Sequence, residues 1–237
     1  MKIPALLRSP AAAELAIRVL ILIATILVIR ACLPERTTLG SQPGVGTNRQ
    51  LIIVPTDGFP SLFLNRLRTR LTEQHKFEVL ITVPMALPPN TEIGSSGQHD
   101  LQMIAEAGFS VCRSQSVGSE YCVVLTTLDI NRKESGLRYL FAQHYKGLSV
   151  VSVARLSEAN FGARLNLLST PIIAERIADR TIKMVNKGLG LDRYGYALST
   201  NKMSVMYAPV MNLSDLDSVG DWYLSDEVRR DNYGTSK

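Results

Sequence analysis

Residues 170–191 read TPIIAERIADRTIKMVNKGLGL, and this stretch decides which kind of domain the chain forms. Apolar residues recur in it every three or four positions, which predicts one long amphipathic helix from Thr170 to Lys187. Gly188 and Gly190 come next, and glycine is common just beyond the last turn of a helix. We therefore expect the helix to end at Gly188.

Basic side chains recur along this helix at a spacing of i, i+4, i+7 and i+11, which places them on one face. The residues are Arg176, Arg180, Lys183 and Lys187. In one interpretation this basic face is solvated and partly neutralised by Glu175 and Asp179. In the other, these residues bind an anionic group of a partner, such as a carboxylate or a lipid phosphate.

Strands and helices alternate on the N-terminal side of this helix. Apolar and β-branched runs predict strands over residues 51–55, 77–83, 121–128 and 148–156. Helical spacing predicts helices over 61–74 and 100–107, the second closed by Gly108. A proline-rich stretch over 84–97 predicts a loop. Such alternation is typical of an α/β or α+β sheet domain.

Several short motifs occur in an order that is more specific than any one of them. They are LIIVP at 51–55, GQHD at 97–100, TTLDI at 126–130, SVVSVARL at 149–156 and the block 182–217. In this order they resemble the archaemetzincin branch of the metzincin zinc peptidases, from about Leu51 to Asp217. The resemblance implies an α/β (α+β) metzincin-like domain with a mixed twisted sheet and a long helix of the active-site type.

An active metzincin carries His-Glu-x-x-His-x-x-Gly-x-x-His at the end of this helix; the histidines bind zinc and the glutamate activates the zinc-bound water. Aligned on Gly190, the motif places Lys183, Lys187 and Arg193 at the ligand positions and Met184 at the general-base position. Protonated lysine and arginine offer a metal no lone pair, and methionine accepts no proton from water. The resemblance therefore implies a pseudoenzyme of the metallopeptidase type, with no catalytic residue, no bound metal and no cofactor.

Other parts of the family pattern lead to the same expectation. The family's methionine turn, which lies beneath the zinc site, corresponds here to Met206 or to Met211. The cysteine cluster that holds the family's second metal is missing, because no cysteine follows Cys122. The chain's three histidines are widely separated and show no ligand spacing; they are His75, His99 and His144.

The N-terminal region differs from the rest of the chain in composition. Residues 19–29 read VLILIATILVI between Arg18 and Arg30, a run too short to cross a bilayer, which takes about 20 residues. The span Ala11–Leu33 is long enough if both arginines reach outward to the headgroups. We expect a retained transmembrane helix there. A signal sequence cleaved at Cys32, which would then carry a lipid, is the alternative.

The remaining segments complete the domain organisation. We expect an N-terminal tail over 1–10, the anchor over 11–33, a polar linker over 34–49, the folded domain over 50–224 and a polar tail over 225–237. A short N-terminal tail before a single anchor usually stays inside, so we place the folded domain on the outer or periplasmic side. There, Cys112 and Cys122 either form a disulfide or remain two buried thiols.

These features together favour a binding function over catalysis. A net charge of +5 without a dense Lys/Arg block argues against nucleic-acid binding. We expect a single-pass, non-enzymatic accessory subunit whose partners are the lipid bilayer and the subunits of a larger membrane complex, for example a respiratory or photosynthetic assembly. The alternative is a peptide-binding pseudopeptidase, in which a peptide pairs with the edge of the 149–156 strand. An active membrane-bound metallopeptidase is the least favoured, since no ligand cluster lies near the helix.

Overall fold

A computed structural model describes residues 49–115, 120–133, 136–157, 168 and 170–224. The expected membrane anchor with Cys32, the C-terminal tail and the linker up to residue 48 lie outside these residues, whereas Arg49, predicted as the end of the linker, is the first residue of a strand. Within the described ranges, no helix is both long and apolar enough to cross a membrane. The predicted anchor Ala11–Leu33 therefore stays a prediction.

The folded domain is built on a mixed, five-stranded sheet with the strand order β2-β1-β4-β7-β6. The strands are β1 (Arg49–Pro55), β2 (Glu78–Ile81), β4 (Tyr121–Thr126), β6 (Ala142–Tyr145) and β7 (Leu148–Ser152). β2, β1, β4 and β7 are parallel to one another, and β6 runs antiparallel to β7 at one edge. A second sheet pairs β3 (His99–Asp100) with β5 (Ile130–Asn131). The predicted mixed sheet is confirmed.

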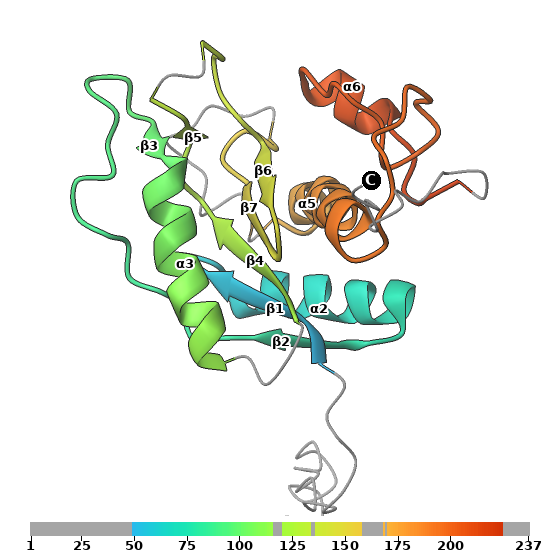
Figure 1. The fold of residues 1–237 in the computed structure, drawn as a ribbon, viewed down its shortest axis with the longest axis horizontal. Coiled ribbons are helices and arrows are strands. Elements are labelled where there is room, and N and C mark those ends of the chain that lie inside the picture. Colours follow the sequence, from blue (N-terminus) through green and yellow to red (C-terminus); the bar gives the residue numbers. More distant parts are fainter. Residues whose placement is uncertain (1–48, 116–119, 134–135, 158–167, 169, 225–237) are drawn as a thin grey trace, which may run out of the picture. The chain divides into compact units, whose positions relative to one another are not determined.

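Helices cover both faces of the main sheet (Figure 1). α2 (Ser61–His75) and α5 (Pro171–Asp192) pack on one face, and α3 (Leu101–Gln115) packs on the other. Successive residues of a strand point to opposite faces, so Ile53 contacts the α2–α5 side while Ile52 and Val54 contact the α3 side. Burial of both faces explains why the central strands read as continuous apolar runs.

The helix predicted over 100–107 is longer than its sequence suggested. It runs to Gln115, and Gly108 lies in its middle rather than at its end. A Cβ atom added at Gly108 would lie 2.0 Å from Cγ2 of Val124, so the glycine lets α3 approach β4 closely. Near the same contact, a disulfide joins Cys112 to Cys122 across a Cα–Cα distance of 6.2 Å. Of the two alternatives for this cysteine pair, the structure contains the disulfide.

The prediction that the long helix ends at Gly188 is wrong, because α5 continues to Asp192. A Cβ atom at Gly188 would lie 2.4 Å from Ser149 Oγ, and one at Gly190 would lie 2.3 Å from Met206 Sδ. Both glycines therefore permit close packing instead of ending the helix. At the true end, the Asp192 carboxylate accepts a hydrogen bond from the Gly147 N–H at 3.0 Å, which ties α5 to the β6–β7 turn.

The C-terminal part of the domain folds across α5. It contains the short helix α6 (Leu213–Ser218), which lies beside α5 in Figure 1. Two backbone hydrogen bonds hold the start and the end of this part together. They run from the Val205 N–H to the Trp222 carbonyl and from the Gly220 N–H to the Lys202 carbonyl. We call residues 199–223 the C-terminal segment. It forms one wall of the candidate site, and β6 forms the other.

Candidate functional site

The positions that align with the zinc motif lie on the side of α5 that faces the C-terminal segment. Lys183 is buried there, and its Nζ donates to the carbonyl oxygens of Val219 at 2.7 Å and Leu216 at 3.2 Å. The same Nζ lies 3.3 Å from the exposed carboxylate of Asp221. Lys183 therefore holds the C-terminal segment against α5.

Arg180 has a similar structural role one turn earlier. Its side chain is only 2% exposed and makes a bidentate contact with Asp217, with Nε to Oδ1 at 2.7 Å. Its Nη1 also donates to the Leu156 carbonyl at 2.6 Å. The hydrogen bond from Arg180 holds the pKa of the Asp217 carboxyl below its usual value. Among the residues of the predicted basic face, Arg176 is the one at the surface, so the face does not present a continuous row of cations to solvent.

Lys187 differs from the other buried cations in its surroundings. Its residue is 8% exposed, and its Nζ donates to the backbone carbonyl of Tyr207. In the described part of the chain, no carboxylate forms an ion pair with it. Burial alone lowers the pKa of this ammonium to about 8. Among the described residues, Lys187 is thus a buried cation with one neutral acceptor.

His144 lies beside Lys187 and enters the site from β6. Its Nδ1 contacts Ser149 Oγ, which also contacts the Tyr121 hydroxyl at 2.6 Å. Burial, together with the Lys187 charge, lowers the pKa of His144 to about 3, so the imidazole is neutral at physiological pH. Burial also raises the pKa of Tyr121. The row of hydroxyls and imidazole is therefore uncharged.

The other histidines belong to separate places in the fold. His75 bonds Asn186 Oδ1 through Nε2 and the Tyr194 hydroxyl through Nδ1, both at 2.8 Å. His99 bonds Thr91 Oγ1 at 2.9 Å. Across the residues that the structure describes, no three His, Cys, Asp or Glu side chains gather closely enough to hold a metal ion.

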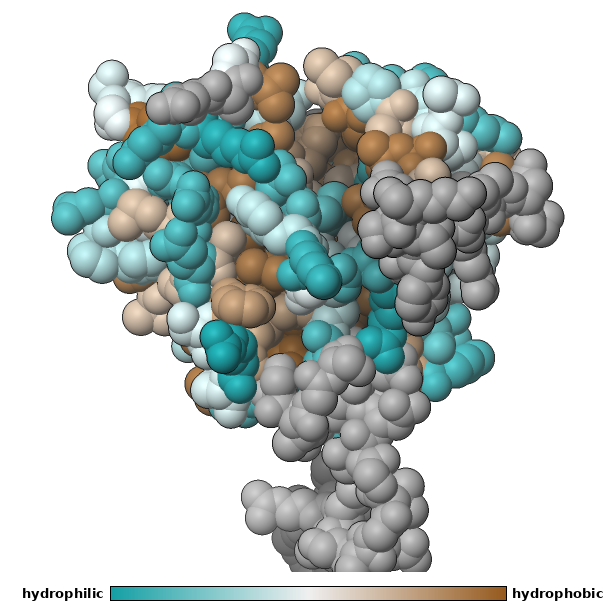
Figure 2. Space-filling model, in the orientation of Figure 1, coloured by the Kyte–Doolittle hydropathy of each residue, from teal (hydrophilic) through white to brown (hydrophobic). Residues whose placement is uncertain are grey.

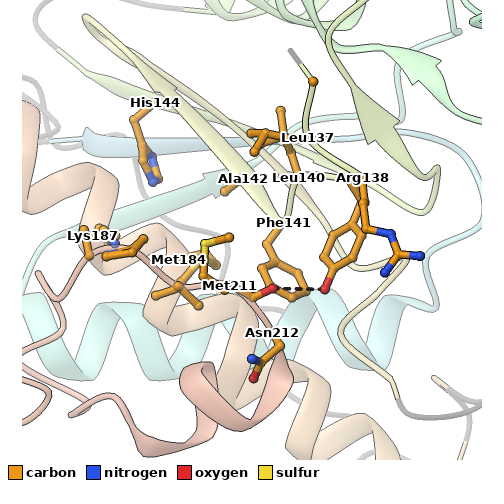
Figure 3. Close-up of a pocket in the computed structure, with 15 residues that line it drawn as sticks. Leu137, Arg138, Leu140, Phe141, Ala142, His144, Met184, Lys187, Met211 and Asn212 are labelled. Atoms are coloured by element: carbon orange, nitrogen blue, oxygen red, sulfur yellow. Dashed lines mark hydrogen bonds between the residues drawn. The ribbon is translucent and has the colours of Figure 1, made fainter.

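A cavity of about 610 Å³ lies between β6, α5 and the C-terminal segment. Figure 3 shows Met184 and Lys187 on α5 at its floor, with the His144 ring directed toward α5. The loop before β6 and residues 208–212 form its walls, joined by a hydrogen bond of 3.1 Å from the Tyr139 hydroxyl to the Met211 carbonyl. In Figure 2 an apolar hollow opens between the β5–β6 side of the molecule and the α6 side.

The open edge of the sheet runs along this cavity. The predicted edge at residues 149–156 is wrong, because β7 lies between β4 and β6 and is paired on both sides. The edge strand is β6. Ser152 N–H donates to the Phe141 carbonyl, and Ala142 lies opposite Val151. This register turns the backbone N–H and C=O groups of Ala142 and His144 away from β7, to the outer edge of the sheet. On this edge the Leu140 N–H donates to the Ile130 carbonyl, and the His144 carbonyl accepts from Gln143 Nε2.

Sequence reasoning missed β6 although a signal for it exists. Only Lys146 and Gly147 separate β6 from β7, and Gly147 has a positive φ of 74°. A two-residue connection that contains glycine between apolar runs is a hairpin signal. The weak alternation of Ala-Gln-His-Tyr in β6 concealed it, because this strand is only partly buried.

Of the two candidates for the methionine turn, the structure places Met206 beneath the long helix. Met206 is fully buried, and its sulfur packs against Gly190. Met211 is 59% exposed at the mouth of the cavity. Arg193 is the C-cap of α5, so the helix passes Gly190 without the turn that the zinc motif makes there.

Comparison with known proteins defines the class of fold. Neither a protein-family model nor a curated protein sequence matches the chain. Among solved structures, archaemetzincin from Archaeoglobus fulgidus in complex with malonate is similar, with a TM-score of 0.55 and 18% identity over 74% of this chain and 96% of that one. Archaemetzincin from Methanopyrus kandleri has a TM-score of 0.55 and 21% identity over 77% of this chain and 93% of that one.

A zinc-dependent peptidase from Methanocorpusculum labreanum is also similar, with a TM-score of 0.59 and 15% identity over 74% of this chain and 96% of that one. The domain therefore has the archaemetzincin-like fold expected from its motifs, which is a fold of an enzyme family. At these identities the likeness concerns the fold alone.

Proposed function

We propose that the chain is a non-catalytic binding protein that holds an extended peptide segment in an inactive metzincin-like cleft. The observation that carries this proposal is the cavity of about 610 Å³ beside the open edge of β6. An extended chain laid against such an edge gains main-chain hydrogen bonds, while the adjoining cavity receives one of its side groups.

The side chains at the motif positions support the non-catalytic part of the proposal. Zinc prefers imidazole, thiolate or carboxylate ligands, and these positions carry Lys183, Lys187 and Arg193 instead. Both lysines donate hydrogen bonds to backbone carbonyls, so their ammonium groups are part of the fold. Met184, at the general-base position, has no group that takes a proton from water. These residues do not fit a zinc ion.

The rival function is an active zinc peptidase, which is what one structural neighbour is called. Two experiments on the purified full-length chain distinguish these functions. Elemental analysis measures the bound zinc, and incubation with added zinc and a degenerate peptide pool measures cleavage. The non-catalytic proposal expects less than about a tenth of a zinc ion per chain and no zinc-dependent cleavage. About one tightly held zinc per chain together with chelator-sensitive cleavage would overturn it.

The cellular setting remains part of the proposal. A helix over Ala11–Leu33 would tether the domain to a membrane, and the tether would raise its local concentration near the subunits of a larger complex. The disulfide between Cys112 and Cys122 supports an oxidising compartment, and hence the outer or periplasmic side. In this setting the bound peptide would be a terminal or looped segment of a neighbouring subunit.

Peptide binding at β6 can be tested by removing one backbone donor. The full-length protein in mild detergent is mixed with a labelled, fully degenerate decapeptide pool, and binding is measured by fluorescence anisotropy. Because the Ala142 N–H faces away from β7, Ala142→Pro removes it without breaking a ladder bond. We expect at least tenfold weaker binding for Ala142→Pro, and near-normal binding for the control Ala142→Ser. Equal binding by both variants would exclude pairing at β6.

A further inference from the structure

We propose that Lys187 and His144 form a subsite for a carboxylate group at the floor of the cavity. The inference rests on the proposed function and names the chemistry that the cleft selects. The bound peptide would place one carboxylate between the Lys187 ammonium and the His144 ring, with the rest of its chain along β6.

The first support is the incomplete pairing of Lys187. An ammonium carries three donors, and the one acceptor found for Lys187 among the described residues is the Tyr207 carbonyl. Lys183 and Arg180, on the same helix, each have an acidic side chain within reach, at Asp221 and Asp217. Lys187 is as buried as Lys183, and no acidic side chain of the described residues pairs with it. A buried charge is normally paired, so an anion beyond the described residues would complete this site.

The second support is the tautomer of His144 that the hydrogen-bond network favours. Tyr121 hydroxyl, Ser149 hydroxyl and His144 Nδ1 form one row. Every proton in the row is used if Tyr121 donates to Ser149 and Ser149 donates to Nδ1 of the neutral ring. Nε2 then carries the remaining proton. Among the described residues Nε2 has no hydrogen-bond partner, which leaves its N–H as a donor for a ligand.

The third support is the composition of the cavity wall. Its described lining contains no acidic residue, and Arg138 adds a second cation near the mouth. Most of the remaining lining is apolar, including Phe141, Met184 and Val210. An apolar lining weakens solvent screening, so an anion bound here interacts with Lys187 more strongly than it would at the surface. A cationic ligand group would find no acidic side chain among these lining residues.

The donor count indicates a carboxylate rather than a phosphate. One ammonium and one neutral imidazole N–H match a singly charged group with two oxygen atoms. A phosphate monoester carries nearly two negative charges and three acceptor oxygens, which the buried part of this site would leave partly unpaired. The carboxylate has two possible sources, the C-terminus of a peptide or the side chain of an Asp or Glu.

The test uses the full-length protein and three labelled decapeptide pools. One pool has a free C-terminus and no Asp or Glu, the second is amidated and carries one Glu, and the third is amidated with no acid. We expect the first or second pool to bind at least tenfold more tightly than the third. Lys187→Met should abolish that difference. Lys146→Met, at an exposed lysine of the β6–β7 turn outside the cavity, should preserve it.

Each outcome decides between the hypotheses. Preference for the free C-terminus identifies a terminal carboxylate, and preference for the Glu pool identifies a side-chain carboxylate. Equal binding of all three pools overturns the carboxylate subsite and leaves peptide binding in place. A carboxylate preference that survives in Lys187→Met also overturns it. If no pool binds, the proposed peptide-binding function fails and the subsite fails with it.

Discussion

At the scale of single residues, Lys187 is the residue that gives the cleft its chemical character. Its ammonium places a positive charge in the floor of the cleft, at a position that the sequence resemblance aligns with a metal ligand of the metzincins. Burial of that charge costs stability, while the proposed carboxylate subsite uses the same charge to bind its ligand. Stability and ligand binding should therefore respond in opposite directions when Lys187 is replaced.

We expect Lys187→Met to stabilise the domain by about 1–2 kcal/mol at pH 7. The pKa of Lys187 falls from 10.5 to about 8 on folding, which corresponds to a penalty of about 3 kcal/mol below pH 8. Losing the hydrogen bond to the Tyr207 carbonyl returns about 1 kcal/mol of that gain. Denaturant unfolding of the full-length protein in detergent gives the free energy of unfolding.

The pH dependence of this effect has a defined sign. Between pH 8 and 10.5 the unfolded chain binds a proton that folded Lys187 has lost, so wild-type stability rises with pH across this window. The advantage of Lys187→Met should shrink accordingly. His144, with a pKa of about 3, does not titrate in the window, and the raised pKa of Tyr121 keeps its hydroxyl protonated. An advantage that grows with pH would contradict the assignment.

At the scale of elements, α5 is the part that organises the site. Its glycines allow contact with β7 and with Met206, and its buried cations attach the C-terminal segment that forms one wall of the cavity. The contact between α3 and β4 supports the sheet from its other face in the same way, through Gly108. Both contacts can be tested by substitution.

Asp217→Asn should lower stability by about 1–3 kcal/mol. The change removes the negative charge that the buried Arg180 guanidinium contacts, and the half-exposed position of Asp217 keeps the cost below that of a fully buried pair. Because the pKa of Asp217 is lowered, its contribution is present above its usual pKa and is lost as the pH falls through the lowered value. The difference between wild type and variant should therefore disappear in strong acid.

The matched control is Asp221→Asn. Asp221 pairs with Lys183 at 3.3 Å, but its side chain is 81% exposed, so the substitution should change the free energy of unfolding by less than about 0.5 kcal/mol. Urea titrations of both variants give the comparison. A larger effect for Asp221 than for Asp217 would mean that Lys183, rather than Arg180, carries the attachment of the C-terminal segment.

Gly108→Ala should destabilise the domain by about 1–3 kcal/mol, although alanine favours a helix by about 1 kcal/mol over glycine. The reason is the added Cβ atom, which would lie 2.0 Å from Val124 Cγ2. Val124→Ala removes that methyl group, so the double variant should be more stable than the sum of the two single effects predicts. Thermal unfolding of all four forms measures this coupling. Strict additivity would show that α3 shifts freely away from β4.

At the scale of the whole molecule, the folded domain provides a cleft, and the N-terminal region is predicted to determine where that cleft works. The disulfide between α3 and β4 is compatible with a domain on the oxidising side of a membrane. A tethered cleft needs only modest intrinsic affinity, because confinement raises the effective concentration of a neighbouring peptide.

We expect the native protein to keep residues 11–33 as a membrane anchor. The apolar run between Arg18 and Arg30 motivates this expectation. Intact-mass spectrometry of protein extracted from its own membrane should find a chain that still contains Ala11–Leu33, and carbonate washing should not release it. A mature chain that begins at Cys32 with a lipid-sized mass increase would instead establish the lipoprotein alternative.

The fold could be predicted largely from the sequence because its signals are local. The alternation of apolar runs identified β1, β4, β7, α2 and α5, and the order of motifs indicated the archaemetzincin-like arrangement that the structural comparisons support. That Lys183, Lys187 and Arg193 are poor zinc ligands also follows from the sequence alone, since a side chain's ability to bind metal depends on its own chemistry.

The candidate site required the tertiary structure. Periodicity placed basic residues on one face of α5 but said nothing of what covers that face, and only the fold brings the Val219 and Tyr207 carbonyls to Lys183 and Lys187. The role of the glycines in α3 and α5 also depended on the tertiary structure. From the sequence, a glycine can mark either the end of a helix or a close contact with another element, and the packing of a residue distant in sequence shows which of the two applies.

The sequence by itself therefore determined the class of domain and the kinds of side chain that stand at the positions aligned with the zinc motif. The tertiary structure decided that β6 is the open edge, that most of the basic face is buried, and that His144 meets Lys187 in one cavity. The physical reason is the range of the interactions. Side-chain chemistry and helical or strand periodicity act within a few residues, whereas burial, pairing of charges and the partner of an edge strand depend on segments far apart in the chain.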